Sequence, residues 1–387
     1  MAGRRPSLLV HVVLAVIVVL WTLPVVGLFV TSLRGGDAVA TSGWWTALAP
    51  NETRGMTRVM GRGLPQDASQ VLEGSLFPRG RAGRIIAVGV RSTAPDAFRP
   101  EQPIEIAGGR LVVEEDGRYR LTLTVPPGGG PTDGSAGNFV PGGGTRIFYT
   151  ARMPAALGFD NYARVFKAEG LLRALLNSIL VAVPSTLIPT LVAAFAAYAL
   201  IWMRFPGRWI MGAGIAALMA VPLQMALIPL LVLYNKAGQA IGVDPRSFIA
   251  VWLAHTGFGL PLAVHILRGA MVAVPPDIIA SARLDGLRED AILFRIVLPL
   301  ALPTIAAFAT FQFLWTWNDL LVALVFLGPQ DDRLVLTGRL LNLLGSRGGE
   351  WEILAAAGFV SMAVPLAVYL GLRKFLMRSF VLGDISE

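Results

Sequence analysis

The chain has 387 residues, of which 54% are hydrophobic and only 15% are charged, and its mean hydropathy is +0.62. A soluble globular domain carries about 25% charged residues, so this composition excludes an ordinary soluble domain and indicates a multi-spanning membrane protein. The net charge of +8 is not evidence for nucleic-acid binding until the basic residues are placed, because membrane proteins gather Arg and Lys in cytoplasmic loops.

The residue types present exclude several kinds of chemistry. The chain contains no cysteine, which excludes disulfide bonds, Cys-ligated zinc and thiol catalysis. His11, His255 and His265 each lie inside an apolar stretch, so a His-based metal site is not expected. No lysine completes a G-x-x-x-x-G-K-[ST] phosphate loop. We therefore expect no catalytic residue, metal ion or cofactor on this chain, and any ATP to be bound by a partner.

Six stretches are apolar for about 20 residues, the length that crosses about 30 Å of hydrocarbon. They lie near residues 8–31, 174–202, 209–234, 248–267, 297–327 and 353–372. The first has an A-x-A pattern at residues 38–40, as signal peptides do, but its apolar run is longer than the ~7–15 residues of a cleavable core. The fold class predicted is an all-α multi-pass membrane protein with six transmembrane helices, the first of them uncleaved.

Basic residues near the ends of these stretches predict the orientation. One side of the membrane is expected to hold Arg4, Arg5, Arg204, Arg208, Arg268, Arg283, Arg288, Arg295, Arg373, Lys374 and Arg378. The short loops of the other side hold Lys236, Arg246, Arg333, Arg339 and Arg347. Because cytoplasmic loops are the more basic ones, both termini are predicted to be cytoplasmic, and the net charge needs no nucleic-acid partner.

Residues 34–155, between a first span at 1–33 and the remaining five at 156–387, have the composition of a soluble domain. Strands are predicted at 84–90, 110–113 and 119–125, with a hairpin turn at Asp116 and Gly117. The Gly- and Pro-rich residues 126–144 are predicted to form a mobile loop. We expect a small external β-rich domain, which is either a docking surface for a soluble partner or a decoration with no direct role.

Residues 275–303, between the fourth and fifth expected spans, read PPDIIASARLDGLREDAILFRIVLPLALP. This segment is too polar to span a membrane and too apolar for a solvated linker. Small residues at 280–282 permit close backbone approach, and Gly286 allows a bend. Apolar residues between 287 and 296 then recur at roughly helical spacing. This pattern predicts a short amphipathic helix that docks on a partner protein.

The segment resembles the cytoplasmic loop of the permease subunits of bacterial ABC importers, whose pattern is E-A-A, then G, then I-x-L-P. The residues that match in register are Ala282, Gly286, Ile296, Leu298 and Pro299. Ala280 and Ser281 depart from the pattern, standing where the family has Glu and its first Ala. Because that Glu is absent, we expect a docking interface that relies on shape more than on a charge pair and depends weakly on salt.

Further pieces resemble the carbohydrate branch of this family: ARLDG at 282–286, FDNYARVF at 159–166, RFPGR at 204–208 and WND at 317–319. A large insert directly after the first span resembles the alpha-glucoside subgroup. The resemblance implies a plasma-membrane (inner-membrane) permease with the six-helix importer fold, forming half of the pathway for alpha-glucosides or other oligosaccharides. The partners it implies are a second permease, two ATPases that hold ATP and Mg, an external sugar-binding protein, the sugar and membrane lipid.

The resemblance also implies that the cytoplasmic loop at 272–299, and its part 277–299 in particular, couples this chain to the ATPases. The coupling residues expected are Ala280, Ser281, Ala282, Asp285, Gly286, Ile296, Leu298 and Pro299.

Polar and aromatic residues inside the spans are candidates for the substrate pathway: Asn177, Gln224, Trp315, Asn318 and Asp319. A carboxylate within a span typically faces a cavity or a partner, and Trp rings suit the C–H faces of a sugar. The alternative is that Asp319 bonds another helix near the outer end of its span while the Trp residues form an interfacial belt. For Asn177 and Gln224 the alternative is hydrogen bonding between helices.

Rival functions are a permease for a non-sugar solute, a membrane enzyme, or a membrane sensor. A phosphate-bearing solute favours intramembrane Arg, and none lies clearly within the six expected spans. The sequence contains no G-x-S-x-G and no H-E-x-x-H motif, which argues against an enzyme. The loop at 286–299 argues against a sensor. The sequence does not identify the sugar.

Overall fold

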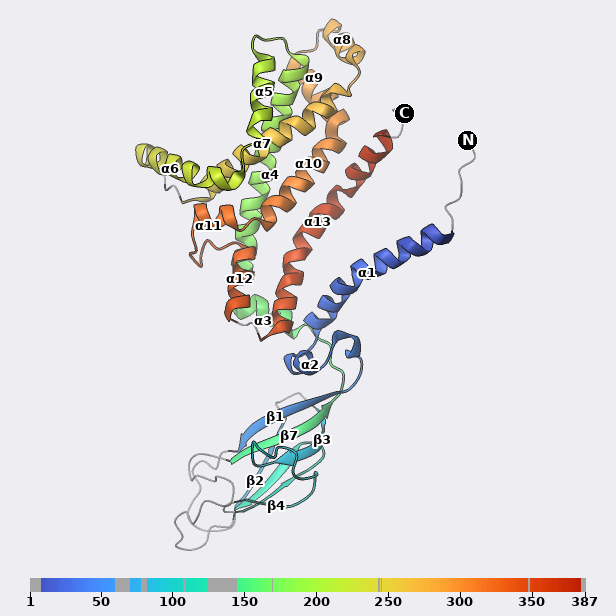
Figure 1. Ribbon diagram of the computed structural model, residues 1–387, viewed down its shortest axis with the longest axis vertical. Coiled ribbons are helices and arrows are strands. Elements are labelled where there is room, and N and C mark those ends of the chain that lie inside the picture. The colour runs from blue at the N-terminus through green and yellow to red at the C-terminus, as the bar shows by residue number, and fades with distance from the viewer. Residues whose placement is uncertain are drawn as a thin grey trace. The chain divides into compact units, whose positions relative to one another are not determined.

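The computed structural model describes residues 8–59, 70–77, 82–106, 109–123, 145–168, 170–242, 244, 246–346 and 349–383. The chain divides into two compact units, residues 1–161 with 349–356 and residues 162–348 with 357–387 (Figure 1). The domain borders expected from the sequence, after residues 33 and 155, remain predictions.

The first unit begins with the apolar helix α1 (Leu8–Leu33), followed by the short helix α2 (Gly36–Thr41) and the 3-10 turn η1 (Trp44–Thr46). Both ends of the insert meet at the end of α1. The backbone N–H of Gly158 donates to the carbonyl of Leu33 at 2.9 Å. The amide of the buried Asn161 donates to the carbonyls of Ser32 and Arg34, each at 2.8 Å. Asn161, the Asn of the FDNY segment, therefore links the end of the insert to its beginning.

Between these ends lie β1 (Asn51–Val59), β2 (Gln70–Ser75), β3 (Arg84–Gly89), β4 (Ile104–Ile106), β5 (Gly109–Val113), β6 (Arg118–Leu123) and β7 (Thr145–Met153). They pair antiparallel in a three-stranded sheet, β1-β7-β3, and a four-stranded sheet, β2-β6-β5-β4. Apolar side chains of both sheets, among them Ile85, Leu111, Leu121 and Ile147, form one core. This part of the chain is therefore β-rich, with two sheets that share a core.

The strands expected at 84–90, 110–113 and 119–125 correspond to β3, β5 and β6. Gly117 has φ of +84° in the turn between β5 and β6, as the Asp-Gly pair predicted. Strands β1, β2, β4 and β7 were not predicted. In β1 the apolar residues do not alternate, because Thr53, Gly55 and Thr57 occupy its less exposed positions. The expected loop at 126–144 lies outside the described residues.

The second unit is helical. Its elements are α3 (Asp160–Ala168, which begins in the first unit), α4 (Leu171–Trp202), α5 (Arg208–Leu218), α6 (Leu223–Ile241), α7 (Phe248–Val272), α8 (Pro276–Leu284), α9 (Glu289–Ile292), the π-helix η2 (Leu293–Val297), α10 (Leu298–Asn318), α11 (Leu321–Leu327), α12 (Leu336–Ser346) and α13 (Trp351–Gly383, which begins in the first unit).

Helices α4, α7 and α10 pack against one another and form the centre of the second unit (Figure 1). Small residues at the contact, including Ala193, Ala197 and Ala263, are fully buried. Small side chains let helix backbones approach closely where the surrounding lipid gives no hydrophobic drive for helix association. Helices α4, α7 and α10 make these close contacts although each of them contains proline.

By length and composition, five helices in the described residues are suited to cross a membrane, or six if the bent pair α5 and α6 forms one span. The stretch expected as a single span at 209–234 is this pair, and its two helices meet at an angle of 107°. Pro222 directly precedes α6 and has no N–H, so the helical hydrogen bonds of α5 do not continue across it. The expected third span therefore corresponds to a bent pair of helices and not to one straight helix.

The fifth expected span, 297–327, also differs from the structure. Helix α10 ends at Asn318, and Asp319 takes an extended conformation with ψ of 106°. Its Oδ1 then accepts the N–H of Val322 at 3.0 Å, so Asp319 ends one helix and helps to start α11. The helix that includes α10 instead begins earlier, at Glu289, and its first turns belong to the segment expected as a loop.

Candidate functional site

Helix α8 ends in a turn that its sequence specifies. Gly286, two residues after the last residue of α8, has φ of +77°. Its N–H donates to the carbonyl of Arg283 at 3.1 Å, and the N–H of Leu287 donates to the carbonyl of Ala282 at 3.1 Å. These two bonds define a Schellman motif, which needs a left-handed residue and therefore favours glycine. The bend predicted at Gly286 agrees with this geometry.

The segment after the turn is not the separate docking helix that the sequence predicted. Helix α9 and the π-helix η2 lead directly into α10, and the N–H of Leu298 donates to the carbonyl of Leu293, five residues earlier. Pro299 has no N–H to donate to the carbonyl of Arg295, so the regular helical pattern is interrupted here. The independent short helix of the loop is α8, before Gly286, whereas residues 289–297 extend α10.

A groove of about 430 Å³ opens on this loop. Its lining residues are Asp277, Ile278, Ser281, Ala282, Asp285, Leu287 and Ile296. The buried Ala282 and the half-buried Leu287 and Ile296 supply apolar surface, whereas the exposed Asp277 and Asp285 supply negative charge. The groove therefore combines side chains from α8, from the glycine turn and from the π-helix.

The groove brings together four of the residues predicted for coupling: Ser281, Ala282, Asp285 and Ile296. Gly286 shapes the turn beside it without lining it. Ala280 is exposed on α8, and Leu298 and Pro299 begin α10. Leu284, which the sequence did not single out, is 88% exposed at the end of α8 and adds an apolar side chain to the surface.

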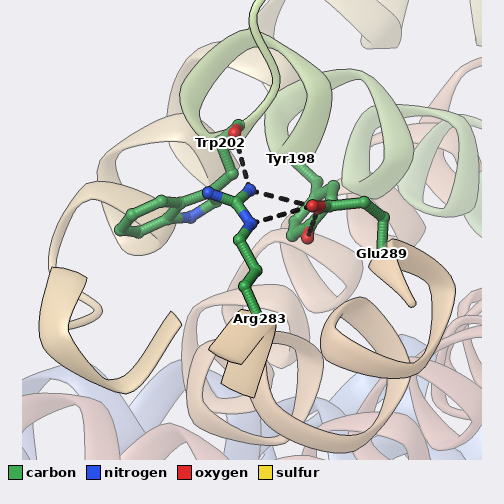
Figure 2. Close-up of polar contacts among 4 residues, drawn as sticks. All are labelled: Tyr198, Trp202, Arg283 and Glu289. Atoms are coloured by element: carbon green, nitrogen blue, oxygen red, sulfur yellow. Dashed lines mark hydrogen bonds and ion pairs between the residues drawn. The ribbon is translucent and has the colours of Figure 1, made fainter. Parts of the chain in front are cut away.

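Arg283 connects α8 to the end of α4 (Figure 2). Its Nε and Nη2 donate to the two carboxylate oxygens of Glu289 at 2.8 and 3.2 Å, and Nη2 also donates to the carbonyl of Trp202 at 2.9 Å. The hydroxyl of Tyr198 donates to the same carboxylate. Hydrogen bonding to Glu289 raises the pKa of Arg283 further above its usual value.

Sequence reasoning did not find this cluster of Tyr198, Trp202, Arg283 and Glu289. Arg283 and Glu289 are six residues apart, a spacing that does not place two side chains on one face of a helix. They meet only because the turn at Gly286 reverses the chain between them. The sequence signal that could have suggested the pairing of Arg283 with Glu289 is Gly286, because glycine permits a turn between them.

The residues expected to line a substrate pathway take separate positions. The Asn177 amide donates to the carbonyls of Asp332 and Leu334, each at 3.0 Å, and so fastens α4 to the segment before α12. Gln224 is exposed in the first turn of α6. The alternative role expected for Asn177 was hydrogen bonding between helices. In the structure Asn177 instead bonds the backbone of a loop.

Trp315, Asn318 and Asp319 lie together at the end of α10. The Trp315 ring is half-buried, with its centroid 6.4 Å from the ring of His255. Asn318 is exposed, and its amide donates to the carbonyl of Leu314 at 2.8 Å. Asp319 caps α11, as described above. A pathway role for these residues stays a prediction, and the structure adds a capping role for Asp319.

A buried polar group in the second unit was also missed. Gln312 of α10 is fully buried, and its amide donates to the carbonyl of Ser185 in α4 at 3.3 Å. His255 of α7 is fully buried as well, as expected from its apolar surroundings, and both its ring nitrogens lack a partner within the described part of the chain. The described residues contain no group of three or more His, Cys, Asp or Glu that could hold a metal ion.

Comparisons with known proteins relate this geometry to a family. Residues 176–381 match the family described as "Binding-protein-dependent transport system inner membrane component". The alpha-glucoside transport system permease protein AglG of Rhizobium meliloti is 48% identical over 380 residues, which cover 97% of this chain and 96% of AglG. The osmoprotective compounds uptake permease protein GgtD of Synechocystis is 46% identical over 227 residues, covering 59% of this chain and 74% of GgtD.

A solved bacterial ABC transporter "involved in the import of the acidic polysaccharide alginate" has a chain that aligns with 57% of this chain and 84% of its own length, with 18% identity and a TM-score of 0.48. The similarity to AglG covers nearly the whole sequence, so it includes most of the insert at 34–155. The family match covers more than half of the chain and includes the loop with the groove. The chain belongs to the family of inner membrane components of binding-protein-dependent transport systems, and is thus a transport subunit, not an enzyme.

Proposed function

We propose that this chain is one permease subunit of an ATP-driven importer of alpha-glucosides, with related oligosaccharides as further substrates. The substrate class rests on the 48% identity to the alpha-glucoside permease AglG over almost the full length of both chains. The transport role rests on the family match.

The observation that carries the coupling role is the groove on the loop of α8. Partner-binding surfaces combine exposed apolar side chains with a few placed polar groups. Here the exposed Ile278 lines a groove that also contains two carboxylates, and the exposed Leu284 precedes Asp285 of that lining. We assign this surface to a separate ATPase subunit, which binds the ATP and Mg that this chain has no motif to hold.

The remaining partners complete the importer. A second permease supplies the other half of the pathway, two ATPases dock on the two permeases, and an external binding protein delivers the sugar. In this proposal α5 and α6 count as one span, giving six, both termini are cytoplasmic, and the strands of residues 51–153 lie outside the membrane. The placement of the strands follows from the Arg and Lys distribution, which puts the loop of α8 on the cytoplasmic side.

Transport follows from coupling two conformations of the membrane helices to two states of the ATPases. A docked ATPase biases the permease only if it binds the two conformations with different affinity. Closure of the ATPase pair on ATP displaces α8, which packs on the bundle through Ile279 and Ala282. Displacement of the packed helices then changes access to the pathway between the two permeases.

Uptake by cells tests the substrate class. Cells that lack this chain, and cells in which it is restored, are given labelled maltose or labelled cellobiose, two disaccharides of equal size with an α and a β linkage. We expect maltose uptake to depend on the chain and cellobiose uptake to be indifferent to it. Equal dependence for both sugars, or none for maltose, would contradict the alpha-glucoside assignment.

A further inference from the structure

The hydrogen bonds of Arg283 join α8 and α9, which are neighbours in the sequence, to the distant helix α4. Arg283 belongs to α8, Glu289 is the first residue of α9, and Trp202 is the last residue of α4. Tyr198, one turn before Trp202, donates to Glu289 as well. The two helices on either side of the Gly286 turn are therefore both attached to the same end of α4 (Figure 2).

The contact to Trp202 gives a hydrogen-bond donor to a carbonyl in the last turn of α4. The last four carbonyls of a helix have no N–H partner within the helix, and cationic side chains there also interact favourably with the helix dipole. Arg283 provides such a cap from another element, 81 residues along the chain. Its planar guanidinium serves the carbonyl and both carboxylate oxygens at once, which a lysine ammonium cannot do in the same fork geometry.

The other contacts of α8 with the bundle are apolar. Ile279 and Ala282 are buried in the same core as residues of α4, α7 and α10. Apolar packing has no preferred direction, whereas a bidentate pair fixes both distance and orientation. Of these contacts of α8, those of Arg283 are the ones that fix a direction relative to α4.

We propose that Arg283 is a positioning residue that fastens α8 to the end of α4, so that a displacement of α8 by a docked partner moves α4 with it. The proposal rests on the proposed function, because the displacement comes from the ATPase. Helix α4 packs along both α7 and α10, so its movement reaches the centre of the bundle. Without the fastening, ATP hydrolysis continues on the docked ATPases but transports less sugar.

The loop offers a matched control in Arg288. It pairs with Asp290 at 3.2 Å within the same segment, and both side chains are more exposed than those of Arg283 and Glu289. Arg283→Gln, Arg283→Lys and Glu289→Gln are compared with Arg288→Gln in proteoliposomes that contain the whole complex. We expect sugar uptake per ATP hydrolysed to fall about fivefold in Arg283→Gln, the scale of a partly exposed pair, with Arg283→Lys intermediate.

The amount of bound ATPase and the hydrolysis rate separate positioning from folding. Both are expected to stay near the parent values in Arg283→Gln. A parallel loss of bound ATPase, hydrolysis and uptake would mean that Arg283 only supports the local structure, and would overturn the proposal. So would a ratio of uptake to hydrolysis equal to that of Arg288→Gln.

A second measurement needs neither sugar nor ATPase. The chain contains no cysteine, so spin labels can be attached only at Ala280→Cys on α8 and Met203→Cys just after α4, both exposed positions. The purified chain is expected to give one narrow distance distribution, which broadens with Arg283→Gln and not with Arg288→Gln. Identical distributions in all three would refute the fastening. If the parent complex fails to transport maltose, the proposed substrate is wrong, yet this distance still decides the role of Arg283.

Discussion

Gly286 allows the turn after α8 to be tested by backbone conformation alone. Its φ of +77° is a value that L-residues rarely adopt, and a Cβ added to it meets no atom within 4 Å. A substitution therefore changes the conformational preference without a clash inside this chain. Forcing a residue with a Cβ into the left-handed region costs about 1–2 kcal/mol, with Asn the least affected and β-branched residues the most.

The loss of affinity for the ATPase subunit is therefore expected to be smallest in Gly286→Asn, larger in Gly286→Ala and largest in Gly286→Val. Since about 1.4 kcal/mol corresponds to a factor of ten, the Ala variant should bind the ATPase subunit about tenfold more weakly, provided the partner recognises the turned loop. The affinity is measured by titrating purified ATPase onto each variant in lipid nanodiscs. Equal affinity of Gly286→Val and the parent would refute the docking assignment, and Asn as damaging as Val would refute the conformational explanation.

Further outcomes follow from the described contacts. Asp319→Asn retains an oxygen to cap α11, whereas Asp319→Ala loses the cap at about 0.5–2 kcal/mol, so equal loss of maltose uptake in both variants would show that the charge serves the pathway. If the Trp315 ring lines the pathway, Trp315→Ala should also lose maltose uptake while the complex stays assembled, and normal uptake would leave the ring a packing role. An impermeant thiol reagent should reach Ser92→Cys from outside the cell and Ala273→Cys only after permeabilisation, and the reverse pattern would invert the topology. Asn161→Ala removes the buried amide that donates to the carbonyls of Ser32 and Arg34, a loss of about 1–3 kcal/mol, and should make the insert more sensitive to limited proteolysis than the parent is.

Sequence patterns anticipated the elements whose signals are local. Apolar length predicted α1, α4, α7 and α13, because about 20 apolar residues form a span whatever surrounds them. Glycine identified the two turns at Gly117 and Gly286, because both need a positive φ. In each case the deciding physics lies within one element or one turn.

The features that the sequence did not predict depend on contacts between elements. Pro222 marks the place where the helix breaks, but the sequence gives no measure of the 107° angle between α5 and α6, because both helices are apolar. The capping bond of Asp319 could not be predicted because it depends on where α10 ends. Arg283 and Glu289 were seen only as charges on a loop, since their pairing requires the chain reversal between them.

The charge of the groove leads to a last prediction, which reverses one made from the sequence. Ala280 in place of the family Glu suggested an interface that depends weakly on salt. The structure, however, lines the groove with Asp277 and Asp285, and neither is in an ion pair among the described residues. The other charges of α8 and α9 largely compensate each other, since Arg283 pairs with Glu289 and Arg288 with Asp290.

A partner surface that meets these two carboxylates gains affinity by presenting cations, and such attraction between exposed groups weakens as the Debye length falls from about 10 Å at 0.1 M salt to 3 Å at 1 M. Binding of the ATPase should therefore weaken measurably between these salt concentrations. Asp277→Asn and Asp285→Asn should each flatten the salt dependence, while Asp290→Asn, which lies outside the groove lining, should leave its slope unchanged. Because the Asn side chain keeps the size and much of the hydrogen-bonding capacity of Asp, a flattened slope reports the charge itself. A parent affinity that does not change with salt would show that the groove binds by shape alone, as Ala280 first suggested.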